Sequence, residues 1–269
     1  MKTALCLVSL VVVLAHPAMT ETIITDDITA DTWWNPCGTP YVIRANVSVT
    51  GNSTLTIESS DTEAVTVIFD GDYYLETEWG SAIVATGNAD HYAVFTSDAA
   101  TPAQGDWKWI EVNGPNASSF TYCMFEYAEQ GVRANYAAPT INYCSFRQCL
   151  YGLFCAGGSP AVQRCDIYAN HAGIAISGSG ATANPIINFN NIHSNTHWNV
   201  YVLSYGEPDA IIDAENNWWG TDEESAIAWE INDATDEPSV HATVDVDPWW
   251  SQQPVEPASW SRVKALFNE

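Results

Sequence analysis

The stretch from Phe120 to Val200 decides the fold, because it contains four variations on one unit. The units read FTYCMFEYAEQGV (120–132), PTINYCSFRQCLYGL (139–153), PAVQRCDIYANHAGI (160–174) and PIINFNNIHSNTHWNV (185–200). Alignment gives three columns: Cys123, Cys144, Cys165 and Asn190; Phe125, Phe146, Ile167 and Ile192; and Val132, Leu153 and Ile174, the last three each after a glycine. Members of the first column are 21, 21 and 25 residues apart. Self-similarity at such a period is typical of solenoid proteins.

Each unit holds two or three short runs of alternating apolar residues, separated by Gly, Pro, Asn and Ser. No segment between the runs has a sustained 3.6-residue period. A unit of this length without a helix cannot bury its own apolar face, so it must stack on copies of itself. We therefore predict an all-β fold, a right-handed parallel β-helix of roughly eight or nine rungs spaced about 4.8 Å apart. Leucine-rich and other helical repeats are the alternative, and the sequence lacks their leucine and helix patterns.

The segment ENNWWGT (215–221) continues the series. Asn216-Asn217-Trp218 follows Asn190-Asn191-Ile192 by 26 residues, which aligns Trp218 with Ile192. Adjacent side chains of a strand point to opposite faces, so one of Trp218 and Trp219 should face the interior and the other should face away. We expect Trp219 either to be covered by the residues that follow or to offer its ring to a ligand.

The sequence as a whole predicts a division of the chain into five segments. These are a signal peptide (1–20), an N-terminal cap (21–40), the β-helix (41–221), a C-terminal cap with a short helix around 222–231 (222–250), and a linker with a short tail (251–269). The signal prediction rests on Lys2, the apolar run 4–15 and the polar residues after it; about 20 apolar residues would be needed to span a membrane. We expect a secreted protein, extracellular or on a bacterial cell surface, without an integral membrane segment after cleavage.

Charge narrows the choice of partners. With 8 basic and 33 acidic residues, the formal net charge is −25, which disfavours nucleic acid and anionic membrane surfaces. Only 15% of the residues are charged and 46% are hydrophobic, which predicts a large core rather than disorder. Neutral glycans, cationic ligands and calcium remain compatible with this charge.

Six cysteines follow the predicted signal peptide: Cys37, Cys123, Cys144, Cys149, Cys155 and Cys165. An even number in an exported chain is compatible with disulfides, but cysteine is also a common buried thiol. Ladder side chains point the same way, so we favour buried thiols for the three cysteines of the first column. Asn190 replaces cysteine in that column, and Asn170 and Asn195 align with Cys149. These positions predict turns at which asparagine amides hydrogen-bond along the axis.

The order of motifs resembles a known family. The series YVI, VSVTGNSTLTIE, AVFTS, GDWKWIEV, FEYAEQGV, PTINYCSF, NNWWGT and DVDPWW, over residues 41–250, is similar to that of bacterial secreted right-handed parallel β-helix repeat proteins with an NNWWG box. Gly105, Trp107 and Ile110 match the family's GxWxGI strand, and Trp109 stands where the family usually has glycine. The resemblance implies the fold; it implies no single activity, because such folds serve lyases, hydrolases, epimerases and non-enzymatic surface proteins.

The residues do not predict an assembled catalytic centre. A lyase would need a carboxylate cluster with an arginine or lysine base, and a hydrolase would need an acid and a base flanking the scissile bond. The candidates in the array are Arg133, Arg147, Arg164, Asp166, Asp213, Asp233, His171 and His193. The arginines lack an accompanying acidic cluster, the aspartates are scattered, and the histidines occur in turn-like segments. We therefore predict no catalytic residues.

Two sequence patterns indicate candidate binding residues. Closely spaced aspartates offer hard oxygen ligands for calcium at Asp70 and Asp72 and again at Asp245 and Asp247, but none completes a known calcium loop. Six of the twelve tryptophans lie from Trp218 onward. A flat aromatic ring beside carboxylates can stack on a pyranose, so Trp219, Trp249 and Trp250 are candidate glycan ligands.

We expect a non-catalytic secreted or cell-surface protein that binds a polysaccharide or another cell-envelope component. The alternative is a polysaccharide lyase or glycosidase on the same fold. Carboxylates converging on one sheet face would favour the enzyme, whereas a face lined by Ser, Asn and Thr would favour binding or scaffolding. The sequence requires no cofactor, leaves calcium open and predicts no oligomeric state.

Overall fold

The computed structural model describes residues 21–178, 183–207 and 209–252. The predicted signal peptide and all but the first two residues of the predicted tail lie outside these ranges.

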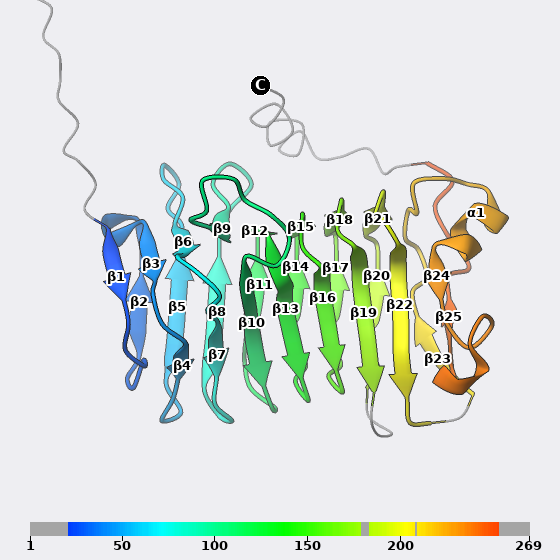
Figure 1. The fold of residues 1–269 in the computed structure, drawn as a ribbon, viewed down its shortest axis with the longest axis horizontal. Coiled ribbons are helices and arrows are strands. Elements are labelled where there is room, and N and C mark those ends of the chain that lie inside the picture. The colour runs from blue at the N-terminus through cyan, green and yellow to red at the C-terminus, as the bar shows by residue number, and fades with distance from the viewer. Residues whose placement is uncertain (1–20, 179–182, 208, 253–269) are drawn as a thin grey trace, which may run out of the picture.

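Three parallel sheets run side by side along one axis (Figure 1). Sheet A contains β1 (Thr22–Ile24), β3 (Tyr41–Ile43), β6 (Thr66–Phe69), β9 (Ala93–Ser97), β12 (Cys123–Glu126), β15 (Ser145–Arg147), β18 (Asp166–Tyr168) and β21 (Asn191–His193). Sheet B contains β4 (Val47–Val49), β7 (Leu75–Thr77), β10 (Trp107–Asn113), β13 (Ala128–Asn135), β16 (Tyr151–Ala156), β19 (Ala172–Gly178), β22 (Trp198–Tyr205) and β24 (Ile231–Asn232). Sheet C contains β2 (Thr32–Trp34), β5 (Thr54–Glu58), β8 (Ala82–Thr86), β11 (Ser119–Thr121), β14 (Thr140–Asn142), β17 (Ala161–Gln163), β20 (Ile186–Asn188), β23 (Ala210–Asp213) and β25 (Ala242–Asp245). The predicted parallel β-helix is confirmed.

The apolar columns of the repeat form ladders in the core. Phe125 pairs in register with Phe146, and Phe146 pairs with Ile167. The rings of Phe95, Phe125 and Phe146 stack at centroid distances of 4.9 and 4.8 Å and are fully buried. A ring in one rung packs closely only if the rungs above and below carry side chains of similar size. This packing requirement explains both the repeat in the sequence and the continuous core.

The predicted asparagine and cysteine positions are confirmed as axial hydrogen-bond ladders. The backbone amide of Cys165 donates to Asn190 Oδ1 at 2.9 Å, and that of Cys149 donates to Asn170 Oδ1 at 3.0 Å. Asn170 in turn donates its backbone amide to Asn195 Oδ1 at 3.0 Å. All six cysteines in the described residues are free thiols, and all but Cys37 are buried. The three first-column cysteines thus pack as small apolar groups.

The alignment predicted for ENNWWGT is wrong by one residue. Asn191 pairs with Trp218 in a parallel bridge, and the Asn190 amide donates to Asn217 Oδ1, 27 positions later. The extra residue lies in β22, whose register with β19 shifts by one: Ile176 pairs with Val202, 26 residues later, but Ser177 pairs with Ser204, 27 residues later. Trp219 occupies the column of Ile192 and is only 1% exposed. Trp218 lies on the outer face, so the prediction that the two rings face opposite sides is confirmed.

Single left-handed residues make the corners between sheet C and sheet A. Tyr122, Tyr143, Arg164, Phe189 and Asn216 have φ angles of 51°, 55°, 55°, 63° and 56°. Each costs about 1–2 kcal/mol in backbone energy, but a one-residue corner lets two strands follow each other without a loop. The side chains project outward as a second ladder, in which Tyr122 and Tyr143 stack at 4.8 Å.

The two end segments join the stack. Residues 21–40 contribute β1 and β2, which pair with β3 and β5, and a 3-10 helix at Pro36–Gly38. Residues 222–250 contribute helix α1 (Glu224–Trp229), within the range predicted to be helical, a 3-10 helix at Pro238–Val240, and strands β24 and β25. The first and last rungs therefore carry the parts of the molecule that differ most from the repeat.

No helix in the described part of the chain combines the length and the apolar character required to cross a membrane.

Candidate functional site

The structure places the three predicted glycan-binding tryptophans in different surroundings. Trp219 is buried in the core column, and its ring is not available to a ligand. Trp250 is partly buried, and its ring lies 5.8 Å from that of Phe189 at the end of the corner ladder. Trp249 packs partly against the core and also lines a cavity. Only Trp249 therefore combines an accessible ring with a concave surface.

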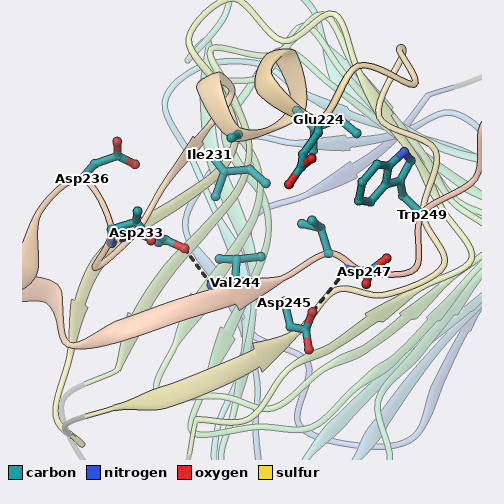
Figure 2. A pocket seen from close by; sticks show the side chains of 12 residues that line it. Glu224, Ile231, Asp233, Asp236, Val244, Asp245, Asp247 and Trp249 are labelled. Atoms are coloured by element: carbon teal, nitrogen blue, oxygen red, sulfur yellow. Dashed lines mark hydrogen bonds between the residues drawn. The ribbon is translucent and has the colours of Figure 1, made fainter.

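The cavity measures about 500 Å³ and lies between α1, β24 and β25, at the C-terminal end of the stack (Figure 2). Its apolar residues are Ile227, Ala228, Ile231, Val244, Val246 and Trp249. Its carboxylates are Glu224, Asp233, Asp236, Asp245 and Asp247. Among the residues that the structure describes, no lysine or arginine lines it. We call this the C-terminal pocket; it brings together Trp249 with Asp245 and Asp247, which the sequence had suggested separately as glycan and calcium ligands.

Local hydrogen bonds fix the wall of the C-terminal pocket. Asp233 accepts the backbone amides of Thr235 at 2.7 Å and Val244 at 2.8 Å, so this carboxylate holds the segment from β24 to β25. Asp245 accepts the backbone amide of Asp247 at 3.2 Å. Figure 2 shows Glu224 and Asp247 beside the Trp249 ring. A ligand in this space would meet one aromatic face and several hydrogen-bond acceptors.

The predicted calcium ligands are not gathered in one place. Asp70 accepts a hydrogen bond from Arg44 Nε at 2.7 Å, and Asp72 lies 3.9 Å from Lys108 Nζ. These two aspartates take part in surface ion pairs, far in the stack from Asp245 and Asp247. In the ranges that the structure covers, no three His, Cys, Asp or Glu side chains are grouped as a metal site.

Sequence reasoning missed a carboxylate pair on the outer face of sheet B. Glu76 of β7 pairs in register with Glu111 of β10. Ser48 donates its hydroxyl to Glu76 Oε1 at 3.0 Å, whereas Glu111 Oε1 accepts from Asn135 Nδ2 at 2.9 Å and Glu111 Oε2 lies 3.3 Å from Arg133 Nε. The two glutamates are far apart in the chain and outside the regular repeat, so only stacking reveals the pair.

The surroundings of the two glutamates differ. Burial raises the pKa of Glu76, the Ser48 hydrogen bond lowers it by a smaller amount, and the charge of Glu111 adds a still smaller increase. Arg133 and Asn135 supply Glu111 with a cation and an amide donor. Rings flank the pair, since Trp109 stacks on Tyr74 at 6.0 Å. A carboxyl group with a raised pKa next to a second carboxyl group that has a cation and an amide donor is the kind of arrangement that acid-assisted hydrolysis uses.

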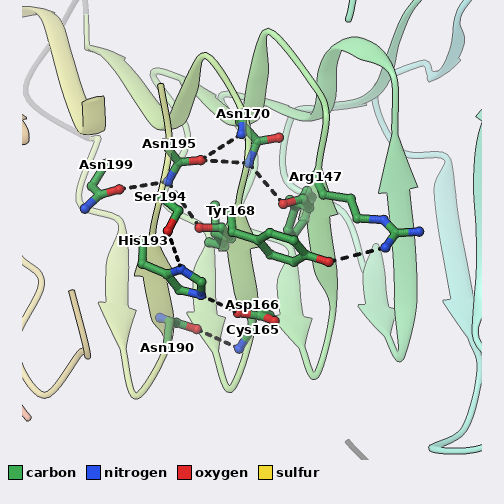
Figure 3. A network of polar contacts seen from close by, with 12 residues as sticks. Arg147, Cys165, Asp166, Tyr168, Asn170, Asn190, His193, Ser194, Asn195 and Asn199 are labelled. Atoms are coloured by element: carbon green, nitrogen blue, oxygen red, sulfur yellow. Dashed lines mark hydrogen bonds and ion pairs between the residues drawn. The ribbon is translucent and has the colours of Figure 1, made fainter. Parts of the chain in front are cut away.

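The outer face of sheet A carries a polar row that the sequence had treated as surface and turn residues (Figure 3). Arg147 Nη1 donates to the Tyr168 hydroxyl at 3.3 Å, and the Tyr168 ring stacks on His193 at 5.7 Å. His193 Nε2 lies 3.3 Å from Asp166 Oδ1. Arg147 also pairs with Glu126. Each of these groups is engaged by a neighbouring rung, so the row stabilises the stack and leaves little binding capacity for a ligand.

Comparison with protein-family models, with curated proteins and with solved structures found no match to this chain. The functional argument therefore rests on the surfaces just described.

Proposed function

We propose that the protein binds glycan at the bacterial cell surface or in the extracellular medium, and that the C-terminal pocket is a binding site. The observation that carries this proposal is the Trp249 ring over an apolar floor with a rim of carboxylates. An aromatic ring stacks on the apolar face of a sugar, and carboxylates accept hydrogen bonds from its hydroxyl groups. The predicted signal peptide and the resemblance to secreted β-helix proteins support the location.

The negative charge of the C-terminal pocket favours some classes of glycan over others. Within residues 21–178, 183–207 and 209–252, no basic residue lines the C-terminal pocket, and the whole chain has a formal charge of −25. An acidic polysaccharide would meet carboxylates without a compensating cation, which costs electrostatic free energy. The proposed ligand is therefore a neutral polysaccharide or one that contains amino sugars.

The test is retention of the protein on insoluble chitin, cellulose and peptidoglycan and on gel-immobilised xylan and polygalacturonate, with calcium and again with EDTA. We expect retention on at least one neutral or amino-sugar polymer, weak retention on polygalacturonate, and a reduction of about tenfold or more for Trp249→Ala, since one stacked ring is worth on the order of 1–2 kcal/mol. Trp229→Ala is the matched control, because Trp229 is 82% exposed on α1 and does not line the pocket. Equal retention of Trp249→Ala and the unmodified protein would contradict the proposed site.

The carboxylate pair favours a second candidate function, hydrolysis of glycosidic bonds. The backbones of register partners in adjacent rungs lie about 4.8 Å apart, which allows two outward-facing carboxyl groups to take the separation of about 5–5.5 Å used by retaining glycosidases. Glu76 would protonate the leaving oxygen, and Glu111 would attack the anomeric carbon. Like charges in directly opposed positions are destabilising, so such a pair on a sheet face calls for an explanation.

Sugar released into the supernatant of the retention experiment tests this second function. The enzyme hypothesis predicts release by the unmodified protein and its loss in both Glu76→Gln and Glu111→Gln, with retained binding. Release that persists in both variants would assign the activity elsewhere, and no release from any retained polymer would leave binding as the function.

A further inference from the structure

A second aromatic platform lies at the other end of the stack. Trp33 of β2 is 57% exposed on the outer face of sheet C. Its neighbour Trp34 is buried and stacks on Tyr41 at 4.8 Å. Because adjacent side chains of a strand point to opposite faces, burial of Trp34 holds Trp33 outward. Its exposure is thus imposed by a rigid element rather than by a loop.

Trp33 stands between two depressions, of about 640 and 410 Å³, and lines both of them together with Glu58. The larger is also lined by Asn35, Pro36, Cys37, Ser59, Ser60, Asp61 and Glu63, and the smaller by Asp31, Thr32, Thr54 and Thr56. Apart from Pro36 and the Cys37 thiol, these supply hydroxyl groups, an amide and carboxylates, and none of the described residues that line either depression is a lysine or arginine. Trp79 and Trp229, which are 66% and 82% exposed, line neither depression.

Backbone contacts hold the walls of both depressions in place. Asp31 Oδ1 accepts the backbone amide of Thr54 at 2.9 Å, which ties the first rung to the second. Asn35 Oδ1 accepts the backbone amide of Cys37 at 2.9 Å. Thr56 is the register partner of Trp33 on the neighbouring strand. A pre-ordered wall loses little conformational entropy when a ligand binds.

We propose that Trp33 is the centre of a second polysaccharide-binding site, with a chain lying across the ring and sugar units in the two depressions. The proposal rests on the proposed function and takes the same ligand class, because both places combine a tryptophan ring with carboxylates and, in the described residues, without lysine or arginine. Sheet C runs from β2 at one end to β25 at the other, so the two sites are separated by about 38 Å along the axis. Each protein molecule would then bridge two glycan strands.

The test uses a polymer that retains the protein, in an insoluble form and in a fluorescently labelled soluble form. The insoluble polymer is coated with protein and washed, and capture of the labelled chain measures bridging. We expect the unmodified protein and Trp79→Ala to capture the chain. Trp33→Ala and Trp249→Ala should each stay attached with an affinity lower by about tenfold to a hundredfold, since avidity is lost, and should capture no labelled chain. The double variant should not be retained.

The outcomes separate the two proposals. Undiminished capture by Trp33→Ala would overturn the second site and leave the C-terminal pocket in place. Full retention of Trp249→Ala together with loss of retention in Trp33→Ala would overturn the C-terminal pocket and leave the second site. Absence of capture by the unmodified protein would overturn bridging, and absence of retention on every polymer would overturn both sites. Circular dichroism and the thermal midpoint of each variant verify that the fold is intact.

Discussion

At the scale of single residues, the six thiols of the described residues differ in how deeply they are buried. Burial raises the pKa of Cys149 and of Cys155 to about 12, whereas Cys37 lies exposed at the first rung. The thiolate is the reactive form, and a buried thiol is also shielded from reagent. Buried thiols at these positions therefore act as small apolar groups rather than as a reactive or cross-linking set.

Thiol titration checks this account. We predict that DTNB modifies Cys37 rapidly in the folded protein, that Cys37→Ser abolishes the rapid phase, and that the five buried thiols react only after denaturation. Rapid reaction of several thiols in the folded Cys37→Ser variant would show that the cysteine columns are open to solvent.

Glu76 provides a pH-dependent prediction. Its pKa is raised in the folded state, so the folded chain holds this proton more tightly than the unfolded chain. The free energy of unfolding therefore decreases as pH rises from the ordinary glutamate range, near 4.5, through the raised value. Glu76→Gln removes this decrease and should be the more stable protein at neutral pH.

Urea unfolding of both proteins between pH 4 and pH 7 measures the difference. The exposed Glu63→Gln serves as the control for removal of one negative charge, because Glu63 is not among the charges that raise the pKa of Glu76. A stability advantage of the unmodified protein that grows with pH would show that Glu76 is stabilised as a carboxylate, against this interpretation.

At the scale of structural elements, the asparagine ladder explains how a rung is joined to the next at its corner. Asn190 Oδ1 accepts from Cys165, and its Nδ2 donates to the carbonyl of Val162 at 2.9 Å, all within the buried core. Asn190→Ala should cost about 1–3 kcal/mol for each buried group left unpaired. Asn190→Cys should restore part of the loss, because Cys144 Sγ accepts the Cys123 amide in the same column.

Denaturant unfolding of the two variants and the unmodified protein tests this ladder. Equal stability of Asn190→Ala and Asn190→Cys would show that the column tolerates any small side chain and that the hydrogen bonds contribute nothing.

The elements also show how far the sequence could lead. The regular spacing of the repeat predicted the columns of Phe146 and Cys144, because each rung needs the same packing at these positions as the rung before it. The register of Trp219 could not be predicted, since a single extra residue in a strand shifts every later side chain to the opposite face. That residue lies at the irregularity of β22, between Val202 and Ser204, whereas the corner after β23 has the same length as the corner after β20.

At the scale of the whole molecule, the sites are products of stacking. Trp249 was a glycan candidate because half of the tryptophans lie from Trp218 onward, and Asp245 and Asp247 were separate calcium candidates because they are closely spaced in the sequence. Trp33 was seen only as part of an end segment, because the groups around it come from the following rung. The pairing of Glu76 with Glu111 likewise depends on the order of the strands in sheet B, which no local pattern contains.

The elongated stack of rungs separates the two proposed binding sites. Trp33 lies in the first rung and Trp249 follows the last strand of sheet C, and the regular rungs lie between them. The regular rungs would then act as a spacer of fixed length between two binding ends.

The measurement that tests the central claim most directly is fluorine NMR of the protein labelled with 5-fluorotryptophan, titrated with the hexasaccharide of a polymer that retains it. Single tryptophan substitutions assign the resonances. The account predicts that the Trp249 and Trp33 resonances shift on titration, whereas those of the buried Trp107 and Trp219 stay in place. An unmoved Trp249 resonance at saturating hexasaccharide would contradict glycan binding in the C-terminal pocket.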